Sequence, residues 1–193
     1  MDIAISLVGL AVTALVFPAV SVLIYRETKA SPIYVQTRIG ENGRRFRLYK
    51  FRSMRKTADQ EKAALLSRNE MDGHMFKIEH DPRVTKIGAF LRKTSLDEFP
   101  QFVNVLRGDM SVIGTRPPLP EEVEMYLPEH KRRLARKPGI TGVWQTHGRN
   151  GVKCFDDVVR MDIAYLTRPT PARYLYLAFA TAMKIFLKKG DGQ

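Results

Sequence analysis

The chain has 193 residues, enough for one domain or for one domain with an appendage, and its 32 Lys and Arg against 20 Asp and Glu give a formal charge of +12. This excess indicates anionic partners: a nucleotide, a phosphate, nucleic acid or an anionic membrane surface. The single cysteine, Cys154, excludes an internal disulfide framework, and no spacing of the four histidines matches a zinc site.

The first predicted element is an uncharged, apolar segment at residues 3–25. As a straight helix it would reach about 34 Å, enough to cross the apolar core of a bilayer. Pro18 predicts a kink or a break, because proline removes a backbone hydrogen bond. The segment therefore either crosses with a kink or enters and leaves by the same face, and the sequence alone favours the crossing.

Two other interpretations of this segment are weaker. A signal peptide fits poorly, because Asp2 stands where a positive charge is expected. A buried core helix would need a larger protein around it. The basic residues that follow the segment predict that this side of the membrane is cytoplasmic.

A hairpin and short helical segments are predicted next. Residues 33–54 hold two β-prone runs around Gly40-Glu-Asn-Gly43, a loop whose glycines suit positive φ. Residues 54–69 have a helical composition, residues 71–81 are expected to form a mobile loop, and apolar spacing predicts a helix over 84–91. A further helix is expected to continue from residue 97 and to stop at Gly108.

The C-terminal part is predicted to be mainly helical. Residues 121–137 form a charged helix that Pro128 interrupts, residues 138–151 a Gly-rich loop, and residues 155–166 a helix with one broad apolar face. A final helix over 172–189 is apolar and aromatic, with lysines at its end. That pattern is typical of a helix in the membrane interface, and equally of an ordinary core-packing terminal helix.

Two adjacent carboxylates, Asp97 and Glu98, stand out in so basic a chain. Ser95-Leu-Asp-Glu98 matches a capping box, in which Ser95 caps a helix and Glu98 returns a hydrogen bond. Pro100 disturbs this pattern, because its missing N–H leaves the carbonyl of Leu96 without a partner, so we expect an irregular helix start. Neighbouring helical residues diverge by about 100°, so the two acids have different roles.

Two loops combine arginine with a stiff or Gly-rich backbone. Arg116 lies between Thr115 and Pro117, and Arg149 lies in His-Gly-Arg-Asn-Gly. Such loops suit phosphate recognition, because the guanidinium binds oxygens in pairs and backbone amides complete the shell. The alternative is that each arginine is a solvated surface charge or a salt-bridge partner.

Four segments of the chain together resemble the bacterial sugar transferases, also called small monotopic phosphoglycosyl transferases. These enzymes move a sugar 1-phosphate from a nucleotide diphosphate sugar to a polyprenol phosphate. Each match is weak alone, but the segments occur in the family's order and cover nearly the whole chain. They are YKFRSM (49–54), SLDEFPQFVNVLRGDMSVIGTRP (95–117), KPGITGVWQTHGRN (137–150) and VVRMDIAYL (158–166).

The resemblance implies an architecture. Residues 1–25 would form a re-entrant membrane helix broken at Pro18, which reverses the preference for a crossing. Residues 26–193 would form a catalytic domain on the cytoplasmic face of the bacterial inner membrane, with a C-terminal interfacial helix. The implied fold class is α+β and mostly α, with a small β-hairpin and interfacial amphipathic helices. Phe17 is a departure, because many members have Ser before the proline.

The resemblance also implies a ping-pong mechanism. Asp97 would attack the sugar-bearing phosphorus of a UDP-sugar, and the phosphosugar would then pass to undecaprenyl phosphate. Glu98 would be a helper, and a Mg²⁺ ion held by Asp97 and Glu98 would screen the diphosphate. Asp162 could orient one of these groups, or it could form a buried salt bridge. Substrate contacts are assigned by the same resemblance to Lys50, Arg52, Arg92, Arg116, Arg149, Asn150 and Asp162.

The implied partners are a UDP-sugar, undecaprenyl phosphate and membrane phospholipid, with no nucleic acid, and the resemblance allows for a homodimer. The reaction would be the first membrane step of exopolysaccharide, O-antigen, capsule or other glycan assembly. Two other hypotheses are a basic membrane adaptor for nucleic acid or anionic lipid, and an inactive subunit of a polysaccharide complex. The first leaves the Asp97-Glu98 pair unexplained, and the intact pair argues against the second.

Overall fold

The fold is mostly helical, as expected, with the predicted β-hairpin and a second small sheet. The computed structural model describes residues 1–148 and 151–187. Its elements are α1 (Asp2–Thr28), β1 (Ile33–Ile39), η1 (Glu41–Gly43), β2 (Arg45–Phe51), α2 (Ala58–Glu61), η2 (Ala63–Arg68), α3 (Lys86–Lys93), η3 (Leu96–Gln101), α4 (Phe102–Leu106), β3 (Ser111–Ile113), α5 (Pro120–Glu124), α6 (Pro128–Lys131), η4 (Arg132–Leu134), β4 (Gly139–Thr141), η5 (Trp144–Gly148), α7 (Phe155–Thr167) and α8 (Pro171–Leu187).

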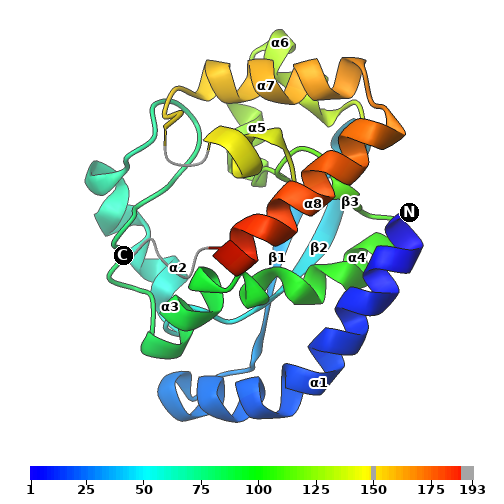
Figure 1. Ribbon diagram of the computed structural model, residues 1–193. Helices are drawn as coiled ribbons and strands as arrows, with labels where there is room; N and C mark the ends of the chain where they lie inside the picture. Colours follow the sequence, from blue (N-terminus) through cyan, green and yellow to red (C-terminus); the bar gives the residue numbers. More distant parts are fainter. Residues whose placement is uncertain (149–150, 188–193) are drawn as a thin grey trace.

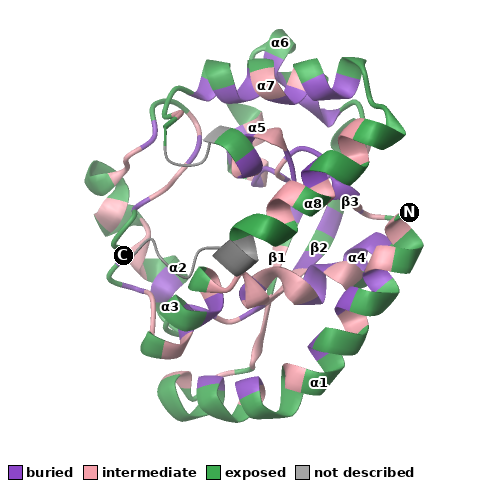
Figure 2. Ribbon diagram, viewed as in Figure 1, coloured by how far each residue is buried: buried purple, intermediate pink, exposed green. Residues whose placement is uncertain are grey.

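In the first half of helix α1 the buried residues are small, whereas large apolar residues are exposed; Figure 2 colours the helix by this burial. Ser6, Gly9 and Thr13 are buried at helical spacing, whereas Leu7 and Leu15 are 57% and 82% exposed. At Gly9 the approach is so close that a Cβ would overlap the ring of Phe102 in α4. Of the described helices, α1 is the one long and apolar enough to cross a membrane, and only 22% of its most apolar stretch is buried. An ordinary core helix has the opposite arrangement.

Helix α1 also bends midway, so that its two arms run along different sides of the molecule (Figure 1). Pro18 lies inside the helix, and its missing N–H accounts for a bend. The helix nevertheless continues through the proline to Thr28.

Both ends of α1 are attached to the rest of the fold. The Asp2 carboxylate accepts hydrogen bonds from the Ser111 hydroxyl and the Val112 N–H, both at 3.0 Å, and from the Tyr174 hydroxyl. At the other end, the Glu27 carboxylate accepts a bond of 3.0 Å from the N–H of Ile87 in α3. Both ends of this apolar helix are therefore hydrogen-bonded to the same folded domain, at β3 and at α3.

The predicted hairpin is confirmed. Strands β1 and β2 pair antiparallel from Ile33 opposite Phe51 to Ile39 opposite Arg45. The turn between them needs positive φ at two residues, and Asn42 (54°) and Gly43 (79°) provide it. The outer edge of β2 is covered by the buried Asn104 of α4. Its amide accepts the N–H of Tyr49 at 3.1 Å and donates to the carbonyl of Arg47 at 2.6 Å, as a neighbouring strand would.

The second sheet was not predicted. Strands β3 and β4 pair in parallel, Ser111 with Gly139 and Ile113 with Thr141, and β4 lies in the stretch 138–151 that was expected to be a Gly-rich loop. The glycines allow this approach, because a Cβ on Gly139 would overlap the backbone of Gly114. Trp144–Gly148 also forms a turn of π-helix in that stretch.

One further predicted helix is divided, and the others are confirmed. Residues 54–69 form two short pieces, α2 and η2, rather than one helix. The interruption of the charged helix is confirmed, because α5 ends at Glu124 and α6 begins at Pro128. Helices α7 and α8 are confirmed, and α8 leaves an apolar face exposed at Leu175, Tyr176, Phe179 and Met183.

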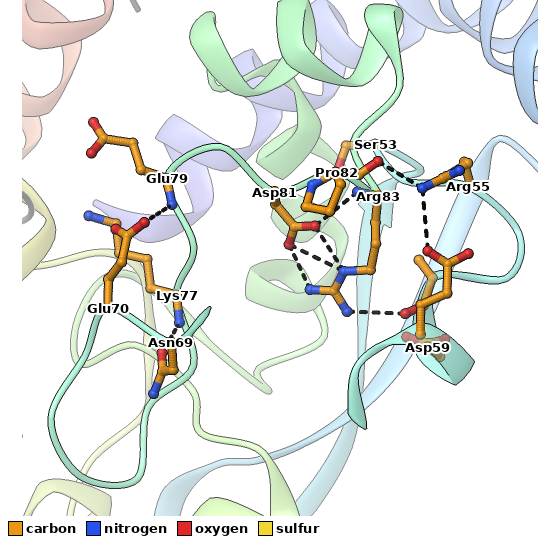
Figure 3. A network of polar contacts seen from close by, with 12 residues as sticks. Ser53, Arg55, Asp59, Asn69, Glu70, Lys77, Glu79, Asp81, Pro82 and Arg83 are labelled. Atoms are coloured by element: carbon orange, nitrogen blue, oxygen red, sulfur yellow. Dashed lines mark hydrogen bonds and ion pairs between the residues drawn. The ribbon is translucent and has the colours of Figure 1, made fainter. Parts of the chain in front are cut away.

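A buried ion pair fixes the connection between β2 and α3 (Figure 3). Arg83 and Asp81 are joined at 2.6 Å, with side chains only 6% and 4% exposed, and Arg83 also donates to the carbonyl of Ala58. Burial alone would raise the pKa of Asp81, but the hydrogen bonds and charge of Arg83 outweigh it and lower that pKa. The backbone of Ser53 is held alongside, because its carbonyl accepts the N–H of Thr85 at 3.1 Å.

The expected loop at residues 71–81 is confirmed as a segment without helix or strand. Hydrogen bonds from residues 69–70 to residues 75–79 hold it in place. The side chain of Asn69 accepts the N–H of Lys77 at 2.8 Å and donates to the carbonyl of Met75 at 2.9 Å. The carboxylate of Glu70 accepts the N–H of Glu79 at 2.8 Å (Figure 3). Its mobility stays a prediction.

A substitution at Gly88 tests the contact of α3 with the end of β2. A Cβ on Gly88 would overlap the carbonyl oxygen of Ser53, and that oxygen is held by Thr85. We expect Gly88→Ala to lower the free energy of unfolding by about 1–3 kcal/mol, the usual cost of overpacking. Gly151→Ala is the matched control, because nothing lies within 4 Å of its Cβ position. If denaturant unfolding gave the two variants equal free energies of unfolding, Gly88 would not lie in close contact with Ser53.

Acid unfolding tests the Asp81–Arg83 pair. Because folding lowers the pKa of Asp81, its stabilisation is present above the unfolded value of about 4 and is lost as the pH falls through the folded value. Asp81→Asn should cost about 3–5 kcal/mol at neutral pH, because it leaves Arg83 buried without its partner. It should also flatten the loss of stability as the pH falls below about 4. Unfolding of the detergent-solubilised protein across this range measures both effects.

The control for this experiment is Asp157→Asn. Asp157 is 52% exposed and pairs with Arg160 on the surface of α7. Such pairs contribute about 1 kcal/mol or less. An Asp81 variant that followed the same pH curve as this control would contradict the account of the buried pair.

Candidate active site

The two adjacent carboxylates lie on an irregular helix. Asp97 and Glu98 are in the first turn of η3, a 3-10 helix that contains Pro100. The irregular start is therefore confirmed, but the capping box is wrong. Ser95 has φ of 57° and its side chain makes no capping hydrogen bond. It turns the chain through the left-handed region instead, a conformation that costs free energy in a residue with a side chain.

Asp97 and Glu98 differ in exposure and in partners. The residue Asp97 is only 9% exposed, whereas the Glu98 side chain is 36% exposed and binds the amine of Lys50 at 3.1 Å. Lys50 comes from β2, and η3 packs along that strand. The expectation that the two acids have different roles thus has a structural basis.

Arg92 lies on the helix that leads to the two acids. It is in the last turn of α3, and its Nε donates to the Ser53 hydroxyl at 3.0 Å. Its charge also contributes to the lowered pKa of Asp81, after burial and the bonds from Arg83. Arg92 is therefore held by Ser53 and lies close enough to the Asp81–Arg83 pair to influence it.

A second polar cluster is formed by Arg38 of β1 together with Arg116 and Glu122. Arg38 is buried and donates to the carbonyl of Pro117 at 2.9 Å, and Arg116 lies 3.4 Å from the carboxylate of Glu122. Burial, and then the charge of Arg116, lower the pKa of Arg38 to about 10. Glu122 also accepts the N–H of Leu119 at 3.0 Å and so caps α5. Two cationic side chains are thereby held close together, an arrangement that favours an anionic ligand.

Asp162 lies in the interior next to this cluster. It is 2% exposed and joined to the buried Arg133 at 2.6 Å, and Arg133 also donates to the Tyr126 hydroxyl at 2.9 Å. The buried salt bridge, one of the two alternatives for Asp162, is thus present. A direct contact of Asp162 with substrate stays a prediction.

One face of the hairpin connects the two clusters. Tyr34 stands directly opposite Lys50, so their side chains share a face, and Arg38 lies four residues further along the same face of β1. At 3.3 Å per residue, this face extends about 13 Å between Tyr34 and Arg38. Burial, then a hydrogen bond to Asp59, raise the pKa of Tyr34 to about 12, so it stays protonated at neutral pH.

The residues expected to bind substrate therefore fall into three groups. Lys50 and Arg92 lie near the acids, and Arg116 and Asp162 belong to the second cluster. Arg52 binds the carbonyl of Ser31 at 2.8 Å and lies over the ring of Tyr34. Arg149 and Asn150 lie outside the described residues.

Sequence reasoning missed the residues that hold these groups in place. In the sequence, Arg38 and Arg133 stand out only as members of the basic excess, and Tyr34 only as a residue of a predicted strand. Glu122 carried a usable signal: Leu119-Pro120-Glu-Glu122 has proline at the first helical position and glutamate at the third. Nothing in the local sequence of Arg133 indicates its pairing with Asp162, 29 residues away.

The donor set around the acids suits one kind of metal ion. In the described part of the chain, no group of three or more His, Cys, Asp or Glu side chains is placed to hold a metal ion. Adjacent carboxylates on η3 are still present. They fit Mg²⁺, which commonly uses one or two carboxylates and takes its other ligands from substrate phosphates and water.

Comparison with known proteins gives matches along most of the chain. Galactosyl transferase CpsE of Streptococcus agalactiae is 57% identical over 141 residues, which are 73% of this chain and 31% of that protein. The UDP-glucose:undecaprenyl-phosphate glucose-1-phosphate transferase of Escherichia coli is 37% identical over 164 residues, 81% of this chain and 33% of that protein. The chain thus spans about a third of the length of these two relatives.

A shorter relative matches from end to end. Exopolysaccharide production protein ExoY of Sinorhizobium fredii is 34% identical over 194 aligned positions, which cover 98% of this chain and 85% of that protein. The model of the family described as bacterial sugar transferase matches residues 1–188. With the paired acids, the basic hairpin face and the apolar helix in place, this match shows that the chain belongs to the bacterial sugar transferase family.

Proposed function

We propose that the protein transfers a sugar 1-phosphate from a UDP-sugar to undecaprenyl phosphate, at an early membrane step of exopolysaccharide or capsule assembly. The observation that carries this proposal is the position of Asp97. This largely buried carboxylate is next to the half-buried Glu98–Lys50 pair, on a segment that packs against the apolar helix α1. Such a site can receive a soluble phosphate substrate and a lipid phosphate at one place. The names of the relatives, which include an undecaprenyl-phosphate sugar-1-phosphate transferase, agree with it.

In the first step, a carboxylate oxygen of Asp97 attacks the sugar-bearing phosphorus of the UDP-sugar. A bond forms between that oxygen and phosphorus, the bond from phosphorus to the bridging oxygen breaks, and UMP leaves with the bonding electrons. The phosphosugar is then held on Asp97 as an acyl phosphate. Burial of Asp97 supports this role, because a poorly solvated carboxylate is a stronger nucleophile and the intermediate is protected from water.

In the second step, a phosphate oxygen of undecaprenyl phosphate attacks the same phosphorus. The bond to Asp97 breaks, the carboxylate is regenerated, and the product is undecaprenyl diphosphate sugar. Dividing the transfer in this way suits a site where one substrate is soluble and the other is a lipid, because the two need not be bound together.

The surrounding cations would stabilise the charge that develops on the phosphates. Lys50, held by Glu98, and Arg92, held by Ser53, are the nearest candidates for the transferred phosphoryl group. A Mg²⁺ ion bound by Asp97 and Glu98 would neutralise the diphosphate and the leaving group.

The second polar cluster would bind the remaining negative charge of the UDP-sugar. Arg116 is a proposed contact for the UMP moiety. Arg38, and Asp162 through its ion pair with Arg133, would hold Arg116 and the residues around it in position. Arg52, Arg149 and Asn150 remain proposed contacts on the grounds of family resemblance. The hairpin face between the clusters is long enough to accommodate a diphosphate.

The placement proposed for the protein is on the cytoplasmic face of the inner membrane, with α1 as a re-entrant helix. Outward apolar side chains on α1 support contact with lipid. The attachment of Asp2 and of Glu27 to one body supports entry and exit by the same face, because a crossing helix would carry Asp2 about 30 Å away. The exposed apolar face of α8 supports its assignment as an interfacial helix.

Release of UMP and the mass of the intact protein test the reaction. Membrane-extracted protein with Mg²⁺ should release UMP continuously from its own UDP-sugar only when undecaprenyl phosphate is present. Without the acceptor it should gain the mass of one phosphosugar. Asp97→Asn should lower turnover by roughly 10⁴-fold or more and abolish the added mass, because it removes the nucleophile.

The matched control is Asp157→Asn, an exposed aspartate on α7 that should leave both readouts unchanged. Glu98→Gln should slow turnover but still allow the added mass to form, because Glu98 is not the attacking group. An Asp97→Asn enzyme that turns over normally, or an adduct mapped to another residue, would show that the mechanism is wrong.

A further inference from the structure

An open groove lies beside the C-terminal end of α1, and none of the residues that line it is assigned to the reaction. Its volume is about 520 Å³, and most of its lining is apolar. We call it the Tyr25 groove, and it is lined by Ser21, Val22, Tyr25, Arg26, Lys29 and Pro32.

The charged side chains of the groove are all basic. Arg26 and Lys29 are exposed, and within residues 1–148 and 151–187 neither takes part in an ion pair. Glu27 lies between them in sequence but is used elsewhere, because its carboxylate accepts the N–H of Ile87. Arg52 adds a third positive charge close by, since it binds the carbonyl of Ser31 next to Pro32.

Lys29, one of the basic residues that line the groove, has an unusual backbone conformation. Lys29 ends α1 in the left-handed conformation, with φ of 50° and its N–H bonded to the carbonyl of Tyr25. Glycine is the usual residue at such a helix end, because a side chain costs free energy there. The Lys29 amine lies 5.7 Å from the centre of the Tyr25 ring. An aromatic ring beside a cation is typical of the level of lipid headgroups.

From these features we infer that the Tyr25 groove binds one acidic phospholipid, with its phosphate between Arg26 and Lys29 and its chains along the outer face of α1. Val22 and Leu23, 52% and 45% exposed, provide the apolar surface for those chains. An acidic headgroup fits better than a zwitterionic one, because no acidic residue lines the groove to receive an ammonium group. This inference rests on the proposed membrane placement of α1, but not on the proposed reaction.

The test is native mass spectrometry of the full chain in non-ionic detergent, titrated with phosphatidylglycerol, phosphatidylcholine or undecaprenyl phosphate. The variant Arg26→Gln/Lys29→Gly removes both charges, and glycine suits the backbone at position 29. The control variant Arg44→Gln/Arg45→Gln removes two exposed charges from the hairpin turn. We expect one tightly bound phosphatidylglycerol on the native and control proteins, and about 10-fold weaker binding to the double variant.

Four results would overturn the inference: equal binding of phosphatidylglycerol to both variants, equal binding of phosphatidylcholine, displacement of the lipid by inorganic phosphate at equal concentration, or tighter binding of undecaprenyl phosphate through the same two residues. The third would indicate a free-phosphate site and the fourth an acceptor site. UMP release is measured in the same preparations, and the double variant should still release UMP. A loss of lipid binding with UMP release retained therefore concerns this inference and not the proposed reaction.

Discussion

The fold depends on the attachment of one apolar helix at both of its ends. Asp2 binds the backbone and side chain at the start of β3, and Glu27 binds the N-terminus of α3. In the first half of α1, small side chains allow close contact with α4, and Leu7 and Leu15 are exposed. The bend at the middle of the helix is what allows both ends to reach the same body (Figure 1).

This attachment brings the apolar helix to the paired acids. Val20 and Ile24 of α1 pack with Phe51 at the end of β2 and with Leu91 of α3, and Leu96, the residue before Asp97, lies against this group. Phe17, where many family members have serine, packs its ring 5.9 Å from that of Phe51. The site that we assign to a soluble sugar nucleotide and a lipid phosphate is thereby built onto the part of the protein that we place in the membrane.

Local patterns in the sequence predicted the elements that depend on local physics. The hairpin, the helices at 155–166 and from 172, and the interruption at Pro128 all follow from alternation, helical spacing and proline. The parallel pairing of β3 with β4 could not be predicted in this way, because it joins two short segments 28 residues apart. The same holds for the site: Asp97 and Glu98 were found as neighbours, but Lys50 is joined to Glu98 only by the packing of η3 on β2. The capping box failed because Ser95 adopts the left-handed conformation and its side chain makes no capping hydrogen bond.

Chemical cross-linking in native membranes tests most directly whether α1 enters and leaves by one face. In a Cys154→Ser background, cysteines at Ile3 and Ser111 should be joined by a short bifunctional thiol reagent, because Asp2 is bonded to Ser111 and Ile3 is exposed beside it. The pair Leu23 and Ser111 is the control and should not be joined, since Leu23 follows the bend of α1, in the arm that lies away from β3 (Figure 1). A helix that crossed the bilayer would separate Ile3 from Ser111 by about 30 Å. Cross-linking of 3 with 111 alone is the predicted result, and its absence in membranes that still show UMP release would contradict the account.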